Sequence, residues 1–387
     1  MRKVLLILVL LPVLAGFGWW YFHQRQIPTF DPAYHEYAYI TNGKSNTVSV
    51  IDLRTFRLTK TLKVGTSPTG IAANSKRNEI YVVNSGSANV SVIDAEHNEV
   101  VATIGVHGMP YFIDVSADGR RGYVANSASS NVSVIDLVNR RVLGTLRVGN
   151  APGLARVSPD GATVVVSNRA ENSVSLIDAQ KLVVRATIPI CGDPTDIAIL
   201  PDSSKAFVAC SGSAQVASLD LKNDKLIALL DVGKTPAALA LKPDGGELIV
   251  CNFDSDNISI IETTTDEVSG SYLIGTHPSR AMVSADNSRL YVSNFGSNSV
   301  AVYDIDMGRL VGSPLPVGSQ PDALALDASQ NYLLVLDSQS GDVTVIQKRK
   351  PRKLEPGEYG LLTMIPAGMQ PNNVVVKSFM LPSRPHK

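Results

Sequence analysis

A strand-like segment that ends in an acidic residue recurs seven times at a constant spacing of 42 residues. The acidic residues are Asp52, Asp94, Asp136, Asp178, Asp220, Glu262 and Asp304, and an eighth copy ends at Gln347 after 43 residues. A period of about 40 to 45 residues, divided into short strands by turn residues, is the signature of β-propeller blades. The sequence therefore predicts an all-β propeller built from four-stranded blades.

One repeat, from Pro68 to Val106, shows the four strands most plainly. They are residues 68–73, 80–84, 90–94 and 100–106, and we name them strands A, B, C and D. β-Branched residues fill the strands, while Gly, Asn, Asp and Ser occupy the turns, as expected of a meander. Strand B ends in a Tyr-Val-x-Asn-like segment in several repeats, at residues 39–42, 81–84, 123–126 and 291–294.

Together with the Val-Ser-Val-Ile-Asp and Val-Gly-x-x-Pro segments, this pattern resembles the YVTN β-propeller repeat family over nearly all of the chain after residue 36. The resemblance implies a propeller that is often exported or on the cell surface. Its wider superfamily includes lactonase-like and cytochrome d1-like propellers, and members commonly have no known reaction. Cys210 and Asp337 depart from the pattern, because each replaces the Asn that ends strand B.

The register of the repeats predicts eight blades. Residues 37–64 supply strands B, C and D, seven full units begin at prolines from Pro68 to Pro321, and residues 371–378 form an additional strand A. Three strands at the front and one at the back complete the eighth blade and leave no open sheet edge. The family resemblance alone favours the alternative of seven blades.

The first 22 residues predict a signal anchor or a cleavable signal peptide. Arg2 and Lys3 precede 19 uncharged residues, the last four of which are Trp19, Trp20, Tyr21 and Phe22. That length approaches the roughly 20 residues that span a bilayer, and aromatic residues favour its interface. We expect residues 23–36 to be a linker, 37–378 the propeller and 379–387 a tail. The propeller would lie outside the cytoplasm, membrane-tethered in the cell envelope or secreted after cleavage. The basic insertion at 348–360 is expected either to form a solvated loop or to rest on anionic headgroups of the membrane.

Charge and cysteine content narrow the functional classes. Lys plus Arg and Asp plus Glu number 35 each, which argues against a nucleic-acid partner. An odd count of three cysteines leaves at least one thiol unpaired. We interpret Cys210 and Cys251 as core residues and not as disulfide partners, because opposed sheet faces lie about 10 Å apart.

Function is expected where the repeat is broken. The loops from D to A and from B to C should surround the channel mouth, and strand A should line the channel. The candidate ligand-binding residues there are His107, Cys191, Asp193, Lys234, Asp196, His277 and Arg280, and further deviations from the repeat are Met109, Asp114, Arg156, Gln320 and Asn373. Neutral variation of exposed loops, and ion pairs between blades, are the alternatives. The repeated Asn and Asp residues are interpreted as structural, since both types bond nearby backbone.

Neither a metal nor a cofactor is predicted. His107, Cys191 and His277 fall in blades two apart, whereas zinc ligands must converge on one ion. Residues 253–257 lack the glycine and distal Glu of a calcium loop. The sequence has no nucleophile signature, phosphate loop or haem-attachment motif. It therefore favours a binding or interaction platform for a protein partner or a small polar ligand, and a lactonase-like hydrolase is the alternative.

Overall fold

The computed structural model describes residues 31–349 and 358–381. The chain divides into two compact units, of which one is Glu36–Ser378 and the other joins the flanking segments, up to His35 and from Phe379. In the flanking unit, Leu381 N donates to the Ala33 carbonyl at 2.9 Å, and the His35 and Phe379 rings stack with their centroids 5.7 Å apart.

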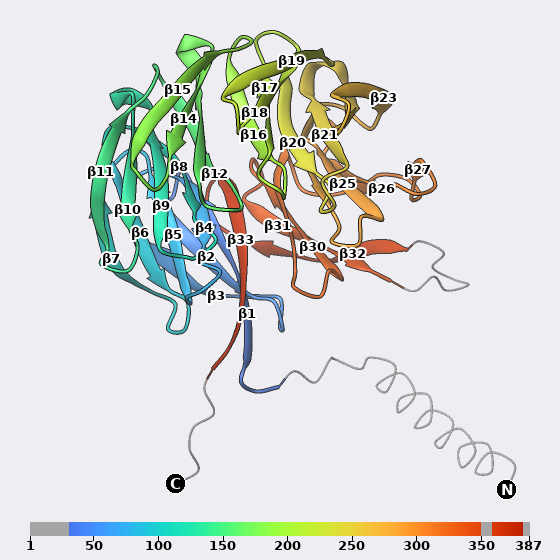
Figure 1. Ribbon diagram of the computed structural model, residues 1–387. Helices are drawn as coiled ribbons and strands as arrows, with labels where there is room; N and C mark the ends of the chain where they lie inside the picture. Colours follow the sequence, from blue (N-terminus) through green and yellow to red (C-terminus); the bar gives the residue numbers. More distant parts are fainter. Residues whose placement is uncertain (1–30, 350–357, 382–387) are drawn as a thin grey trace, which may run out of the picture. The chain divides into compact units, whose positions relative to one another are not determined.

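The described residues form eight antiparallel sheets, which we number as blades 1 to 8 along the chain (Figure 1). Blade 1 contains β1 (Tyr34–Asn42), β2 (Thr47–Asp52), β3 (Arg57–Lys63) and β33 (Pro371–Met380). Blade 2 contains β4 (Pro68–Ala73), β5 (Glu79–Asn84), β6 (Asn89–Asp94) and β7 (Glu99–Gly105). Blade 3 contains β8 (Pro110–Val115), β9 (Arg121–Asn126), the short helix η1 (Ser127–Ser129), β10 (Asn131–Asp136) and β11 (Arg141–Arg147).

The next three blades repeat this order. Blade 4 contains β12 (Pro152–Val157), β13 (Thr163–Asn168), η2 (Arg169–Glu171), β14 (Ser173–Asp178) and β15 (Val183–Pro189). Blade 5 contains β16 (Pro194–Ile199), β17 (Lys205–Cys210), β18 (Gln215–Asp220) and β19 (Lys225–Asp231). Blade 6 contains β20 (Pro236–Leu241), β21 (Glu247–Asn252), η3 (Phe253–Ser255), β22 (Asn257–Glu262) and β23 (Glu267–Leu273).

The last two blades differ in their outer strands. Blade 7 contains β24 (Pro278–Val283), β25 (Arg289–Asn294), β26 (Ser299–Asp304) and an outer strand split into β27 (Arg309–Leu310) and β28 (Leu315–Pro316). Blade 8 contains β29 (Pro321–Leu326), β30 (Tyr332–Asp337), β31 (Asp342–Lys348) and β32 (Tyr359–Pro366). The first strand of each of blades 2 to 7 contacts the first strand of the following blade, so these strands form the centre of the ring.

Blade 1 is closed by the two ends of the chain. Its strand order is β3-β2-β1-β33, and Figure 1 shows β1 in blue beside β33 in red. Thr41 Oγ1 donates to Asn372 Oδ1 at 2.5 Å, and Gly43 N donates to the Gln370 carbonyl at 2.9 Å. This arrangement confirms the prediction of eight blades, and the alternative of seven is wrong.

The N-terminal segment and most of the basic insertion cannot be compared with this fold. Residues 1–22, predicted to be a signal anchor or signal peptide, lie outside the described residues, as do residues 350–357. Across residues 31–349 and 358–381, no helix has the length and apolar character needed to cross a membrane.

The core lies between successive blades. Strands B and C are buried along almost their whole length, because each sheet packs against a neighbour on both of its faces. Tyr81 of blade 2 packs in this way against Ile113 and Val124 of blade 3. Burial on both faces explains why strand B is almost continuously apolar.

The Asn that ends strand B joins strand B to strand C below the loops. Asn168 Nδ2 donates to Ser173 Oγ at 3.0 Å and to Ser175 Oγ at 2.9 Å. The same pair of bonds recurs from Asn42, Asn84, Asn126 and Asn252. A Gly of the D-to-A loop packs on this Asn: a Cβ on Gly149 would lie 2.6 Å from Asn168 Cγ. The Asn is therefore structural, although it binds side chains of strand C and not its own loop.

Candidate functional site

A cavity of about 1190 Å³ opens at the mouth of the channel. First strands of several blades supply part of its lining, including Tyr111, Phe112, Arg156, Asp196, Arg280 and Asp322. The D-to-A loops contribute Met109 and Asp193, and the B-to-C loops contribute Arg169 and Ser211. The predicted placement of these loops around the mouth is therefore confirmed.

Three of the predicted site residues line this cavity, and four do not. Asp193, Asp196 and Arg280 belong to the lining. His107 lies outside it, with Nε2 3.0 Å from Thr145 Oγ1. His277 stacks on Phe253 with the ring centroids 4.5 Å apart, and Lys234 is exposed on its loop.

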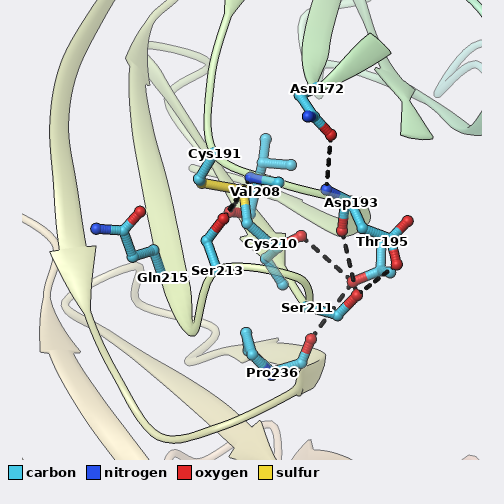
Figure 2. The surroundings of a disulfide bond; sticks show 12 residues. Asn172, Cys191, Asp193, Thr195, Val208, Cys210, Ser211, Ser213, Gln215 and Pro236 are labelled. Carbon is cyan, nitrogen blue, oxygen red and sulfur yellow. Dashed lines mark hydrogen bonds between the residues drawn. A yellow bond between two sulfur atoms is a disulfide. The ribbon is translucent and has the colours of Figure 1, made fainter. Parts of the chain in front are cut away.

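Cys191 is the fourth residue outside the lining, and it forms a disulfide with Cys210, as Figure 2 shows. The Cα atoms of the two residues are 5.6 Å apart. The prediction that Cys210 is a free core residue is therefore wrong. That prediction considered opposed sheet faces, but the bond joins a strand to the loop that lies on its end. Cys251 is a buried free thiol, as predicted, and burial raises its pKa to about 12.

The disulfide occupies the place where other blades pack a Gly on an Asn. Cys191 follows Gly149 by 42 residues, and Cys210 follows Asn168 by the same interval. The bond ties down the loop that carries Asp193, whose carboxylate accepts a hydrogen bond from Ser211 Oγ at 2.7 Å (Figure 2). The repeat is broken at both Cys191 and Cys210, whose equivalents Gly149 and Asn168 are in contact. These two changes together were the signal in the sequence for this bond.

Arg169 and Asp193 form an ion pair on the rim. The guanidinium binds the carboxylate through two nitrogens, at 2.9 and 3.1 Å. The hydrogen bond from Arg169 lowers the pKa of Asp193, and the bond from Ser211 adds to this effect, against the raising effect of burial. Sequence reasoning missed Arg169, although its equivalents in blades 2, 3 and 5 are serines.

Deeper in the channel, two aspartates connect neighbouring blades. Asp114 Oδ2 accepts a hydrogen bond from Val157 N at 2.9 Å and Asp114 Oδ1 lies 3.8 Å from an Arg156 nitrogen. Asp196 Oδ2 accepts from Leu239 N at 3.0 Å in the same way. Arg156 also lies over the Phe112 ring, 4.5 Å from its centroid. For Asp114 and Arg156, the alternative of an ion pair between blades is thus the correct one.

Arg280 and Asp322 are different, because their charged groups have no direct partner. Within the described part of the chain, neither side chain makes a hydrogen bond or an ion pair. Burial alone would lower the pKa of Arg280, but the charges of Asp196 and Asp322 outweigh it and raise the pKa. Burial raises the pKa of Asp322, and Arg280 opposes that shift. The two charged groups therefore interact electrostatically without a direct hydrogen bond or ion pair.

Asp322, Tyr111 and Phe112 are lining residues that sequence reasoning missed. Each stands one or two positions after the proline that begins strand A. These positions face the channel in several blades, which only the observed lining reveals. A comparison of all eight strands at these two positions would have found them.

No metal site is evident in what the structure describes. Among residues 31–349 and 358–381, no three His, Cys, Asp or Glu side chains are grouped so that they could hold a metal ion. The calcium-like segment 253–257 forms η3 and the turn after it, and Asp256 Oδ1 accepts a hydrogen bond from His277 N at 2.8 Å.

Solved structures with a similar fold include the following three. The chain matches Kuenenia stuttgartiensis hydrazine synthase with a TM-score of 0.58 and 23% identity, over 69% of this chain and 91% of the other. It matches dihydro-heme d1 dehydrogenase NirN in complex with DHE with a TM-score of 0.70 and 14% identity, over 91% and 77%. A functionally unknown protein from Desulfotomaculum acetoxidans gives a TM-score of 0.60 and 15% identity, over 88% and 98%. At these identities the likeness shows the fold alone.

Sequence comparison adds the family. No curated protein is significantly similar to the chain. A family described as "Lactonase, 7-bladed beta-propeller" matches residues 263–360. A family described as "YNCE-like beta-propeller" matches residues 26–158 and 153–241, which together make up more than half of the chain. The chain therefore belongs to the YNCE-like β-propeller family.

Proposed function

We propose that this protein is a binding protein outside the cytoplasm that holds a small polar ligand in the mouth of its propeller channel. The observation that carries the proposal is that Arg280 and Asp322 face one cavity with opposite charges and no direct partners among the described residues. Closing a ring does not require these charges, since blade 6 has Ala237 and Ala238 at the corresponding positions. Charges buried without partners cost stability, so a role in binding is the reason to keep them.

The disulfide supports export. Disulfides persist in oxidising compartments and are rare in the cytosol. The bond between Cys191 and Cys210 therefore agrees with the basic and apolar N-terminal sequence, which we propose directs the propeller across the membrane. We further propose that residues 1–22 stay attached as a tether and leave the mouth accessible to a ligand or a protein partner.

Fluorescence tests the tether, because Trp19 and Trp20 are the two tryptophans of the chain. Protein purified from the membrane fraction of its native cells should show tryptophan emission. Native protein that is soluble and has no tryptophan emission would show that the segment is removed, and it would refute the tether but not the ligand site.

A lactonase-like hydrolase is the second candidate. The match to the lactonase family spans residues 263–360 and so includes Arg280 and Asp322. Neither His107 nor His277 lines the cavity, so a hydrolase here would need a carboxylate such as Asp322 as its general base. Lactone turnover by the wild-type protein that is lost in Asp322→Asn would favour this candidate over the binding protein.

Ligand screening tests the proposal itself. The full-length protein in detergent is heated with a panel of small acids, amines, amino acids and sugars, and the melting temperature is recorded. At least one compound should raise it, and the rise should disappear in Arg280→Gln while persisting in Lys234→Gln, which removes a positive charge from the same face outside the cavity. A compound that stabilises both variants equally binds elsewhere and would contradict the proposal.

A further inference from the structure

The two unpaired charges lie on neighbouring inner strands. Arg280 is on β24 and Asp322 on β29, and these strands pack against each other. Both side chains line the cavity, and each keeps some surface toward it. An Arg and an Asp on adjacent strands ordinarily form a direct ion pair with hydrogen bonds. Here the two charged groups line the same cavity without a direct bond between them.

Asp196 adds a second carboxylate whose position is well defined. Its Oδ1 accepts a hydrogen bond from Ile197 N at 2.9 Å, and its Oδ2 accepts from Leu239 N at 3.0 Å. Backbone donors of this kind fix the orientation of the carboxylate. Asp196 also attracts Arg280 electrostatically without forming an ion pair with it. The cavity that Arg280 lines is therefore also lined by two carboxylates, those of Asp196 and Asp322.

This arrangement discriminates between ligands by their charge. A simple anion would bind Arg280 but be repelled by Asp322 and Asp196. A simple cation would bind the two carboxylates but be repelled by Arg280. A neutral sugar would leave the charges without ionic partners. A molecule that carries a carboxylate and an ammonium group on neighbouring atoms satisfies both sides at once.

We propose that the channel binds a zwitterion, an α-amino acid, with its carboxylate on Arg280 and its ammonium group between Asp322 and Asp196. This inference rests on the proposed function, because it names the ligand class of the same cavity. The cavity of about 1190 Å³ leaves room for the amino-acid side chain, and the exposed Tyr111 ring in its lining offers an apolar surface with which that side chain can pack.

Calorimetry with matched analogues tests the inference. The full-length protein in detergent is titrated with the common L-amino acids one by one, and then with the N-acetyl and amide derivatives of the tightest binder. The N-acetyl derivative lacks the cation, and the amide lacks the anion. Each derivative should bind about 10- to 100-fold more weakly than the parent, as expected for the loss of a hydrogen bond to a charged group.

Two variants assign the groups. Arg280→Gln should no longer distinguish the amino acid from its amide, and Asp322→Asn should no longer distinguish it from its N-acetyl derivative. Because each variant is judged by a ratio of affinities, a modest loss of folded protein does not change the result. Lys234→Gln and Asp306→Asn, two exposed charge removals outside the cavity, should retain both ratios.

The outcomes separate this inference from the proposed function. If succinate, putrescine or a sugar binds in an Arg280-dependent manner and no amino acid does, the cavity is a ligand site and the zwitterion is wrong. If an amino acid binds but both variants keep the wild-type ratios, the assigned contacts are wrong. If no probe binds in the cavity, both proposals fail.

Discussion

Asn168 and Arg169 are consecutive in the chain, but they differ in how they use the repeat. Asn168 lies beneath the mouth, and its amide bonds recur in the same geometry in four other blades. Arg169, the next residue, lines the cavity and changes from blade to blade. Repetition accompanies polar groups that the fold itself satisfies. Variation accompanies charges such as Arg280, which the fold leaves without a partner.

The largest expected effect comes from opening the ring of blades. Removing the chain after Pro366 deletes β33 and exposes the edge of β1, so blade 1 loses its innermost strand. The expected loss of stability is roughly 5 kcal/mol or more, accompanied by aggregation through the open edge. Thermal melting and light scattering measure both effects, and removal of residues 382–387 alone is the control. A truncated protein that stays monomeric and melts unchanged would show that closure does not stabilise the ring.

In blade 8, Asp337 replaces the Asn that ends strand B in most other blades. Its side chain is fully buried and accepts a hydrogen bond from Thr344 Oγ1 at 2.6 Å. Burial raises the pKa of Asp337 from 3.8 to about 7, and Asp342 contributes in the same direction. The folded state thus retains a proton that the unfolded state loses near pH 4. Stability of the wild-type protein should fall as the pH rises from about 4 to about 7.

Asp337→Asn should remove this pH dependence. The variant should equal the wild-type protein near pH 4 and exceed it at pH 8 by about 4 kcal/mol, since the pKa of Asp337 rises from 3.8 to about 7 and each pKa unit corresponds to about 1.4 kcal/mol. Urea unfolding at both pH values measures the difference. An equal pH dependence in the two proteins would show that Asp337 is ionised in the fold.

Blade 5 tests whether a covalent bond replaces the Gly and Asn packing. The combined change of Cys191 and Cys210 to Ala should cost about 3 kcal/mol, because the bond closes a loop of 19 residues. Restoring the ordinary pair with Cys191→Gly and Cys210→Asn should recover part of that loss. Thiol titration provides an independent check: one thiol, that of Cys251, after unfolding without reductant, and three after reduction. Three thiols without reductant would contradict the disulfide.

The smallest expected effect comes from a direct comparison of a repeated asparagine with a residue that lines the cavity. Asn168→Ala should cost about 1–3 kcal/mol, because it removes two buried hydrogen bonds. Arg280→Gln should not lower stability, since no direct contact of its charge is lost and a buried charge without a partner costs stability. Urea unfolding of the two variants without ligand measures this difference. Equal costs would mean that Arg280 is as structural as the asparagine.

The sequence was sufficient for the fold because the fold is repeated. One register, read from Asp52 to Gln347, places every strand, and the surplus strand at 371–378 reveals the eighth blade. It was much less informative about the site. Asp193, Asp196 and Arg280 could be selected as deviations, but His107 and His277 deviate equally and lie outside the cavity. A break in a repeat identifies an altered position and does not say in which direction the side chain points.

By itself, the sequence determined the strand order, the number of blades and the face on which the loops gather, because these follow from local periodicity and chain connectivity. Tertiary structure decided which altered residues meet. The approach of Cys191 to Cys210 depends on a loop folding over a strand end, and the separation of Arg280 from Asp322 depends on the spacing of two blades. Both are distances between segments that the repeat does not encode, so only packing in three dimensions determines whether such groups bond or remain available to a ligand.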